Sequence, residues 1–337
     1  MIKKLYIILF ISIWALSSQA QVLPNFGGER AGLSTLSFLK NDLNPRSIAM
    51  AGSSVSLSGD AYSVLTNPAA LGGLENNSYA ASHLFLGGGI NQSLLTGNYL
   101  LKDKISHLAF SINSLNSGEM EERTEFQPLG TGRQVYVSNL ALGISYAREL
   151  SKVFSAGISL KYIYEGIANY SNHNATVDVS FLYKTDFKSL QFAVMVQNFG
   201  GNSALGNTDE DIPVVYNRTT GINLDANTVP TVFSLGLSFK PLEEDHQSLT
   251  ASIQLNHPND NAENFRLGFE YEIRQLFFVR TGYKMSVKGQ HLPTFGFGLR
   301  SKMGGRPLYI DYAINPTNFL GFQHSIGLRL DILNNER

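Results

Sequence analysis

The sequence predicts an all-β protein: a transmembrane antiparallel β-barrel of about 14 strands built around a compact N-terminal segment. Three observations lead to this prediction. The chain begins like an exported protein, and almost everything after residue 78 alternates apolar and polar residues with a period of two. Residues 44–71 do not alternate; they are rich in glycine, serine and alanine and need an enclosure.

The N-terminus has the order of regions found in a secretory signal peptide. Lys3 and Lys4 precede an apolar run, residues 5–16, and small and polar residues follow up to Ala20. This run of about a dozen residues is too short for a transmembrane helix. We therefore expect residues 1–20 to be a signal peptide, and there is no cysteine near the cleavage site to carry a lipid anchor.

The composition restricts the class of protein. With no cysteine, the chain has neither disulfides nor thiolate metal ligands. A formal net charge of −1 offers no basic surface for nucleic acid, and the seven histidines form no metal-like pair. We predict no metal, no cofactor, no nucleic-acid partner and no enzymatic activity. An exported chain with 31 Gly, 15 Tyr and 21 Phe and only 16% charged residues is either a secreted all-β protein, such as a sandwich, or an outer-membrane barrel.

Periodicity decides between these two classes. Within 248–256 the odd positions are apolar and the even ones polar, so the strand has one apolar face and one polar face. Most such segments reach the roughly nine residues needed to cross a bilayer, whereas sandwich strands average about five or six. The predicted strands are 78–86, 91–100, 105–115, 134–149, 153–166, 174–185, 189–199, 229–240, 247–256, 264–274, 277–287, 292–302, 306–315 and 322–333.

The connections agree with a barrel. Those after even-numbered strands are short, as expected of periplasmic turns, and the two longest gaps, 116–133 and 200–228, follow odd-numbered strands, as expected of outer loops. We therefore assign residues 78–333 to an outer-membrane barrel and 334–337 to a polar tail. Aromatic residues stand towards strand ends on the apolar face, where lipid-facing girdles belong: Tyr136, Tyr146, Tyr162, Tyr164, Tyr183, Phe239, Tyr271, Tyr283 and Tyr312.

The polar faces of the strands carry charges of both signs. We predict that these side chains face the lumen and pair across neighbouring strands or with the enclosed segment, and that they need not mark a site. The principal ones are Arg266, Glu270, Arg274, Arg280, Arg300, Asp311 and Arg329.

The enclosed segment contains two helix-like pieces. Pro45 suits a first helical turn and Gly52 a C-terminal stop, while Asp60 is placed to cap residues 61–65 before Asn67-Pro68 breaks the run. The most distinctive positions are Pro45, Arg46, Gly52, Asp60, Asn67, Pro68, Ala69 and Leu71.

These positions carry a resemblance to a known family. The segment 37–76, with Pro45-Arg46-Ser47, Gly59-Asp60-Ala61 and Asn67-Pro68-Ala69-Ala70-Leu71, resembles the opening of the PorV/PorQ family of Bacteroidetes outer-membrane proteins, which are relatives of the FadL-type fatty-acid channels. The resemblance implies that residues 21–77 form an N-terminal segment and plug inside the lumen of a fourteen-stranded barrel.

The two branches of this superfamily imply different functions. The PorV/PorQ branch implies a component of type IX secretion or surface attachment that binds partner components, secreted proteins or their C-terminal domains through its outer loops. The FadL branch implies a channel for small hydrophobic molecules. Because the polar faces of the strands are charged, we favour the function implied by the PorV/PorQ branch and keep the FadL-like channel as the alternative. In either case the surrounding partners are outer-membrane lipids and lipopolysaccharide.

Overall fold

The computed structural model describes residues 34–57, 59–207 and 226–332. The predicted signal peptide, the first part of the segment 21–77, the centre of the second long loop and the polar tail lie outside the described residues. None of the described helices is long and apolar enough to span a membrane.

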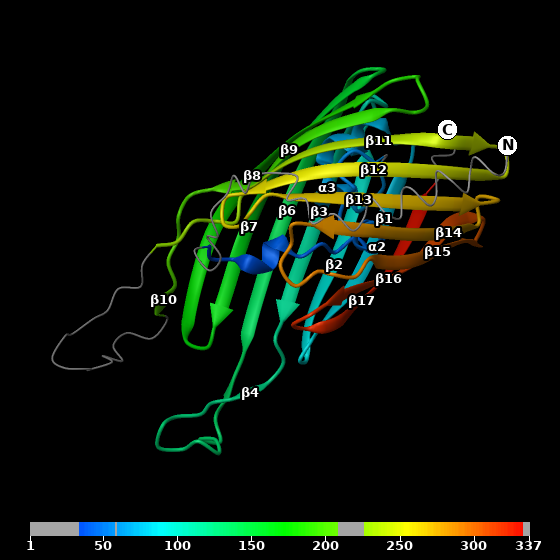
Figure 1. Cartoon of the computed structure of the whole chain (residues 1–337). Coiled ribbons are helices and arrows are strands. Elements are labelled where there is room, and N and C mark those ends of the chain that lie inside the picture. Colours follow the sequence, from blue (N-terminus) through cyan, green and yellow to red (C-terminus); the bar gives the residue numbers. More distant parts are fainter. Residues whose placement is uncertain (1–33, 58, 208–225, 333–337) are drawn as a thin grey trace, which may run out of the picture.

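Fourteen antiparallel strands form a closed barrel, because β1 pairs with β17 as well as with β2 (Figure 1). The predicted fold is thus confirmed, and every predicted strand overlaps an observed one. The strands are β1 (Asn77–Gly87), β2 (Ile90–Leu100), β3 (Ser106–Asn116), β6 (Val137–Ser151), β7 (Phe154–Ile167), β8 (Tyr170–Lys184), β9 (Gln191–Gly200), β11 (Val232–Glu244), β12 (Gln247–Pro258), β13 (Asn264–Ile273), β14 (Phe277–Met285), β15 (Thr294–Met303), β16 (Arg306–Thr317) and β17 (Gly321–Ile332).

Three shorter strands lie beside the barrel. The predicted strand 134–149 is divided, since β5 (Gln134–Val135) leaves the wall and pairs with β4 (Met120–Glu121). The hairpin that contains β4 extends well beyond the end of the barrel (Figure 1). β10 (Gly206–Asn207) pairs with β8.

The two ends of the barrel differ in their connections. Short turns join the strands at one end, and the long connections 117–136 and 201–231 lie at the other. Because outer-membrane barrels have short periplasmic turns and longer extracellular loops, the first end is periplasmic and the second is the outer end.

Apolar and polar residues separate across the wall as the alternation predicts. In β12, Ser252 and Gln254 are buried towards the lumen, whereas Ile253 between them is exposed on the outside. The predicted aromatic residues lie on the outer surface: Tyr136, Tyr146, Tyr162, Tyr183, Phe239 and Tyr283 are exposed, and Tyr164, Tyr271 and Tyr312 are half-buried. Such an apolar exterior is what a lipid environment requires.

The plug, residues 34–76 without residue 58, lies inside the lumen as short helical turns. They are η1 (Ser37–Lys40), α2 (Pro45–Ala49), α3 (Ser63–Thr66) and η2 (Pro68–Gly73). At the start of α2, the Asn44 side chain accepts a hydrogen bond from the Arg46 N–H at 3.0 Å, with Pro45 at the first helical position. Gly52, at φ 77°, follows the helix and donates its N–H to Ser47 O.

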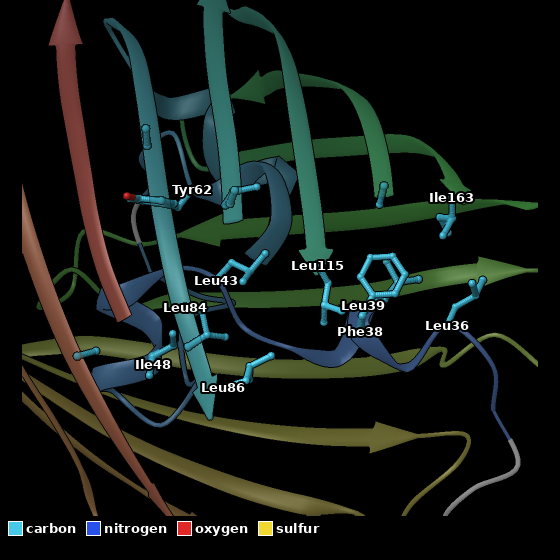
Figure 2. Close-up of a cluster of buried hydrophobic side chains, with 14 of the residues drawn as sticks. Leu36, Phe38, Leu39, Leu43, Ile48, Tyr62, Leu84, Leu86, Leu115 and Ile163 are labelled. Atoms are coloured by element: carbon cyan, nitrogen blue, oxygen red, sulfur yellow. The ribbon is translucent and has the colours of Figure 1, made fainter. Parts of the chain in front are cut away.

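A hydrophobic core fills the space between the plug and one side of the wall. Leu36, Phe38 and Leu43 from the plug are buried against wall residues that include Leu84 and Ile163 (Figure 2). The lumen is therefore packed at this level, and the plug supplies much of the apolar surface that the polar lumen wall lacks.

Candidate functional site: the plug and its two cavities

One side of the plug is held by buried ion pairs. The guanidinium of Arg46 donates from Nε and Nη2 to the two carboxylate oxygens of Glu270, at 2.8 and 2.6 Å. Arg280 Nε donates to the same carboxylate at 2.6 Å, and its Nη1 donates to Asp311 at 2.5 Å. Glu270, Arg280 and Asp311 are buried. Gly298 makes room for them, since a β-carbon there would collide with Asp311 and Arg280.

A second ion pair joins the plug to the last strands. Arg329 Nη1 donates to Asp60 at 2.9 Å, and the guanidinium lies 3.7 Å from the ring centroid of Tyr309. We call Arg46, Asp60 and their partners on β13, β14, β16 and β17 the charged contact. In it, a cation of the plug pairs with an anion of the wall, and an anion of the plug pairs with a cation of the wall.

The other side of the plug is held by close packing. A β-carbon at Gly157 would collide with the backbone of Pro68 and Ala69, so only glycine allows η2 to lie this near β7. The Ala69 N–H donates to Ser180 Oγ at 2.9 Å. Val55, Ala69 and Ala70 also pack with Leu182, Ala193 and Met195. We call this region, η2 against β6–β9, the packed contact.

The plug positions singled out from the sequence are brought together in the lumen. All are buried except Arg46, which is half-buried. Asn67 organises the turn between α3 and η2: its Nδ2 donates to Val55 O at 2.5 Å, and its Oδ1 accepts from the Ala69 N–H at 3.0 Å. Leu71 is fully buried against β3 and β6. These contacts are structural.

Six of the seven predicted lumen charges face the lumen, and one prediction is wrong. Arg274 lies in an exposed turn after β13, which ends at Ile273. Arg274 and Gln275 both have positive φ, 52° and 55°, as in a two-residue hairpin turn. The turn takes Arg274 out of the alternation that we extended one residue too far.

The sequence reasoning missed the glycines that face the plug. At Gly236, Gly268, Gly282, Gly296 and Gly327, a β-carbon would collide with plug atoms. These glycines stand at lumen-facing positions of β11, β13, β14, β15 and β17. Their repetition on one face of successive strands was a signal available in the sequence.

A cavity of about 670 Å³ lies between the plug and the outer end of the barrel. Apolar side chains that include Leu39, Val55 and Met195 line part of it. Arg266 and Lys284, directly opposite each other on β13 and β14, line another part. The cavity therefore offers both an apolar surface and a pair of adjacent cations.

The plug contributes a carboxylate to the same cavity. Asp42 accepts hydrogen bonds from the Ser47 hydroxyl and, at 3.0 Å, from the Asn44 N–H. Burial raises the pKa of Asp42 above its ordinary value, although these hydrogen bonds and the charges of Arg266 and Lys284 act in the opposite direction.

A second cavity, of about 230 Å³, lies on the periplasmic side of the plug and is lined in part by Arg46, Leu57 and Arg300. The plug residues 52–57 separate the two cavities along β11–β13. Hydrogen bonds hold this stretch: Ser53 Oγ lies 2.7 Å from Ser252 Oγ, Gln254 Oε1 accepts from the Val55 N–H at 3.0 Å, and Arg266 Nη1 donates to Gly52 O at 3.5 Å. Among the described residues, no group of three or more His, Cys, Asp and Glu is arranged to hold a metal.

The chain is similar in fold to solved structures of transporters and channels. The chain is similar to the toluene transporter TodX of Pseudomonas putida, with a TM-score of 0.56 and 11% identity over 90% of this chain and 98% of that one. It is also similar to the monoaromatic hydrocarbon channel CymD, with a TM-score of 0.55 and 11% identity over 87% and 98%. A FadL homologue of Pseudomonas aeruginosa follows at a TM-score of 0.50 and 12% identity over 87% and 98%.

No protein-family model matches the chain, and no curated protein matches it in sequence. At such low identity the likeness concerns the fold. The closed barrel, its enclosed plug and its apolar exterior therefore define an outer-membrane protein. Within that class, the chain is similar in fold to these transporters and channels, while the narrower resemblance to PorV/PorQ stays a prediction.

Proposed function

We propose that the protein is a FadL-like channel that admits small hydrophobic molecules carrying a polar group. The observation that carries the proposal is the 670 Å³ cavity on the outer side of a plug, in a barrel that covers 98% of the toluene transporter TodX. Its lining combines Leu39, Val55 and Met195 with Arg266 and Lys284. An apolar body would contact the first group, and a polar or anionic group would contact the cations.

The two cavities suggest a route through the plug. Residues 52–57 lie between them and carry only small or apolar side chains without an ion pair among the described residues, in contrast to Arg46 and Asp60 on either side. Displacement of this stretch from β11–β13 would join the cavities without breaking the charged contact.

A disulfide tests both the channel and the route. The chain has no cysteine, so Ser53→Cys with Ser252→Cys would tether this stretch to β12, where the two Oγ atoms are 2.7 Å apart. Ser145→Cys with Ser159→Cys is the matched control, since those Oγ atoms are 2.6 Å apart but both belong to the wall. Uptake of radiolabelled toluene and octanoate is measured in cells that express each variant, before and after reduction.

We expect the first pair to lose uptake when oxidised and to regain it on reduction, while the control pair keeps it. If cells with the unmodified protein take up neither probe faster than cells that lack it, the proposed channel function is wrong. If the oxidised first pair takes up both probes normally, the channel stands and the route is wrong.

A second candidate function rests on the outer loops. Phe126 and Leu129, in the predicted partner loop 116–133, are 95% and 91% exposed. Apolar side chains this exposed favour a protein partner, such as a type IX secretion component or a cargo C-terminal domain. The other predicted loop, 200–228, lies largely outside the described residues.

Affinity purification from native membranes tests this candidate. We expect Phe126→Ser with Leu129→Ser to lose a partner that the unmodified chain and a Phe187→Ser control retain, because Phe187 is exposed at the periplasmic end. Recovery of no secretion component or C-terminal domain by any of the three would contradict the candidate.

A further inference from the structure

Three oxygen-bearing side chains form a row across the outer half of the lumen wall. Asn139 on β6 is paired in register with Glu165 on β7, and Glu165 with Asn172 on β8. The three residues are 5%, 6% and 2% exposed. They are therefore neighbours on the lumen face, away from water and outside both cavities.

The oxygens of this row lack donors among the described residues. Asn139 Oδ1 and Asn172 Oδ1 are buried and accept no hydrogen bond there. Glu165 accepts one, from the hydroxyl of Thr35 at 3.0 Å, and forms no ion pair with a described residue. The nearby Lys161 does not neutralise it, because its Nζ lies 2.5 Å from Asp178 and donates to Asn198.

Thr35 of the plug brings these groups together. Its Oγ1 accepts from Asn172 Nδ2 at 3.2 Å while it donates to Glu165. The Glu165 carboxylate and the Asn172 amide nitrogen thus both contact Thr35 Oγ1, and Asn139 is the neighbour of Glu165 on the other side. Buried oxygens without donors are costly, and a buried carboxylate needs a compensating charge.

We propose that Asn139, Glu165 and Asn172, completed by the Thr35 hydroxyl, bind a hard cation of the calcium type. Carboxylate and amide oxygens are the ligands that such cations take. Bound there, the cation supplies both the missing charge and the missing partners. It also joins the plug to β6–β8, because Thr35 is further bound through its N–H to Thr228 O at 3.1 Å.

The affinity should be weak because the row provides one carboxylate. Calcium sites of extracellular modules reach dissociation constants of about 1 mM, and affinity rises with the number of charged ligands. Asn139→Asp adds a second carboxylate and should bind calcium roughly tenfold more tightly. Glu165→Gln removes the only charge and should lose binding.

The test titrates calcium, up to about 10 mM, into the full chain purified in detergent, and follows both heat of binding and thermal midpoint. Glu263→Gln is the matched control, a carboxylate at the outer end between β12 and β13 that contacts His257. We expect a rise of the midpoint in the unmodified chain and in the control, a larger rise in Asn139→Asp, and none in Glu165→Gln.

Two outcomes would overturn the proposal. Equal responses in all four proteins would mean that calcium acts through lipid or loops. No response in the unmodified chain or in Asn139→Asp would mean that the row binds no calcium. The Asn139→Asp result decides the matter even if Glu165→Gln fails to fold.

Discussion

The charged contact and the packed contact hold the same plug by different physical means. On the side of β13–β17, Arg46 and Asp60 lose hydration when the plug is enclosed, and their ion pairs with Glu270 and Arg329 compensate for this loss. On the side of β6–β9, η2 lies against Gly157 with no space for a side chain. A buried ion pair destabilises the protein when one partner is removed, whereas a closely packed contact destabilises it when a larger side chain is introduced.

The difference suggests how a plug is fixed without being uniformly rigid. The ion pairs set the orientation of α2, and Gly157 sets how near η2 approaches the wall. Residues 52–57, between these contacts, are held by hydrogen bonds such as that from Ser238 Oγ to Ser56 O at 2.9 Å, and they lie close to Gly236 and Gly268 of the wall. A neutral hydrogen bond contributes about 1 kcal/mol net, and this stretch has no ion pair with a described residue.

The largest effect is expected at the centre of the charged contact. Glu270→Ala leaves Arg46 and Arg280 without their shared carboxylate, and such a loss costs about 3–5 kcal/mol of unfolding free energy. Urea unfolding followed by circular dichroism measures it. Glu272→Ala, on the same strand and bonded to Ser248, is the control and should cost far less. Equal losses in the two variants would show that the ion pairs contribute little.

The packed contact should respond to a single added carbon. Gly157→Ala places a β-carbon against the backbone of Pro68 and Ala69, and overpacking of this kind costs about 1–3 kcal/mol. Gly201→Ala is the control, since nothing lies within 4 Å of its β-carbon. The heat-resistant, folded fraction on gels measures assembly. An unchanged Gly157→Ala barrel would contradict close packing at η2.

Asn67 connects the two contacts and should have a smaller effect. Asn67→Ala removes the N-terminal cap of η2 and the bond to Val55 O, for a loss of about 1–2 kcal/mol. We expect lower barrel levels but normal uptake or partner binding per folded molecule, with Asn91→Ala as the control. Normal barrel levels with selective loss of binding would give Asn67 a specific functional role.

The smallest effect is expected at an ion pair outside both contacts. Lys240 and Glu243 lie 2.7 Å apart, but their side chains are 35% and 53% exposed. Exposed pairs contribute about 0–1 kcal/mol, so Lys240→Ala should barely change urea unfolding. A loss of unfolding free energy comparable to that of Glu270→Ala would mean that the buried ion pairs of the charged contact contribute no more than an exposed one.

Much of the fold could be read from the sequence because its signals are local. Alternation along each strand determines which face meets lipid, and the lengths of the connections determine which end is periplasmic. Six lumen charges and the helical turn that begins at Pro45 and stops by Gly52 were predictable for the same reason. Arg274 was misplaced because a hairpin turn interrupts alternation without a glycine to mark it.

What only the tertiary structure decided are the contacts between distant residues. Arg46 meets Glu270 and Asp60 meets Arg329 because the barrel closes around the plug in one register, which no local pattern encodes. The same holds for the collision that excludes a side chain at Gly157, the two cavities, and the row of Asn139, Glu165 and Asn172. The sequence by itself determined a barrel with charges on its inner face, and the path of the plug through the lumen decided which of them meet.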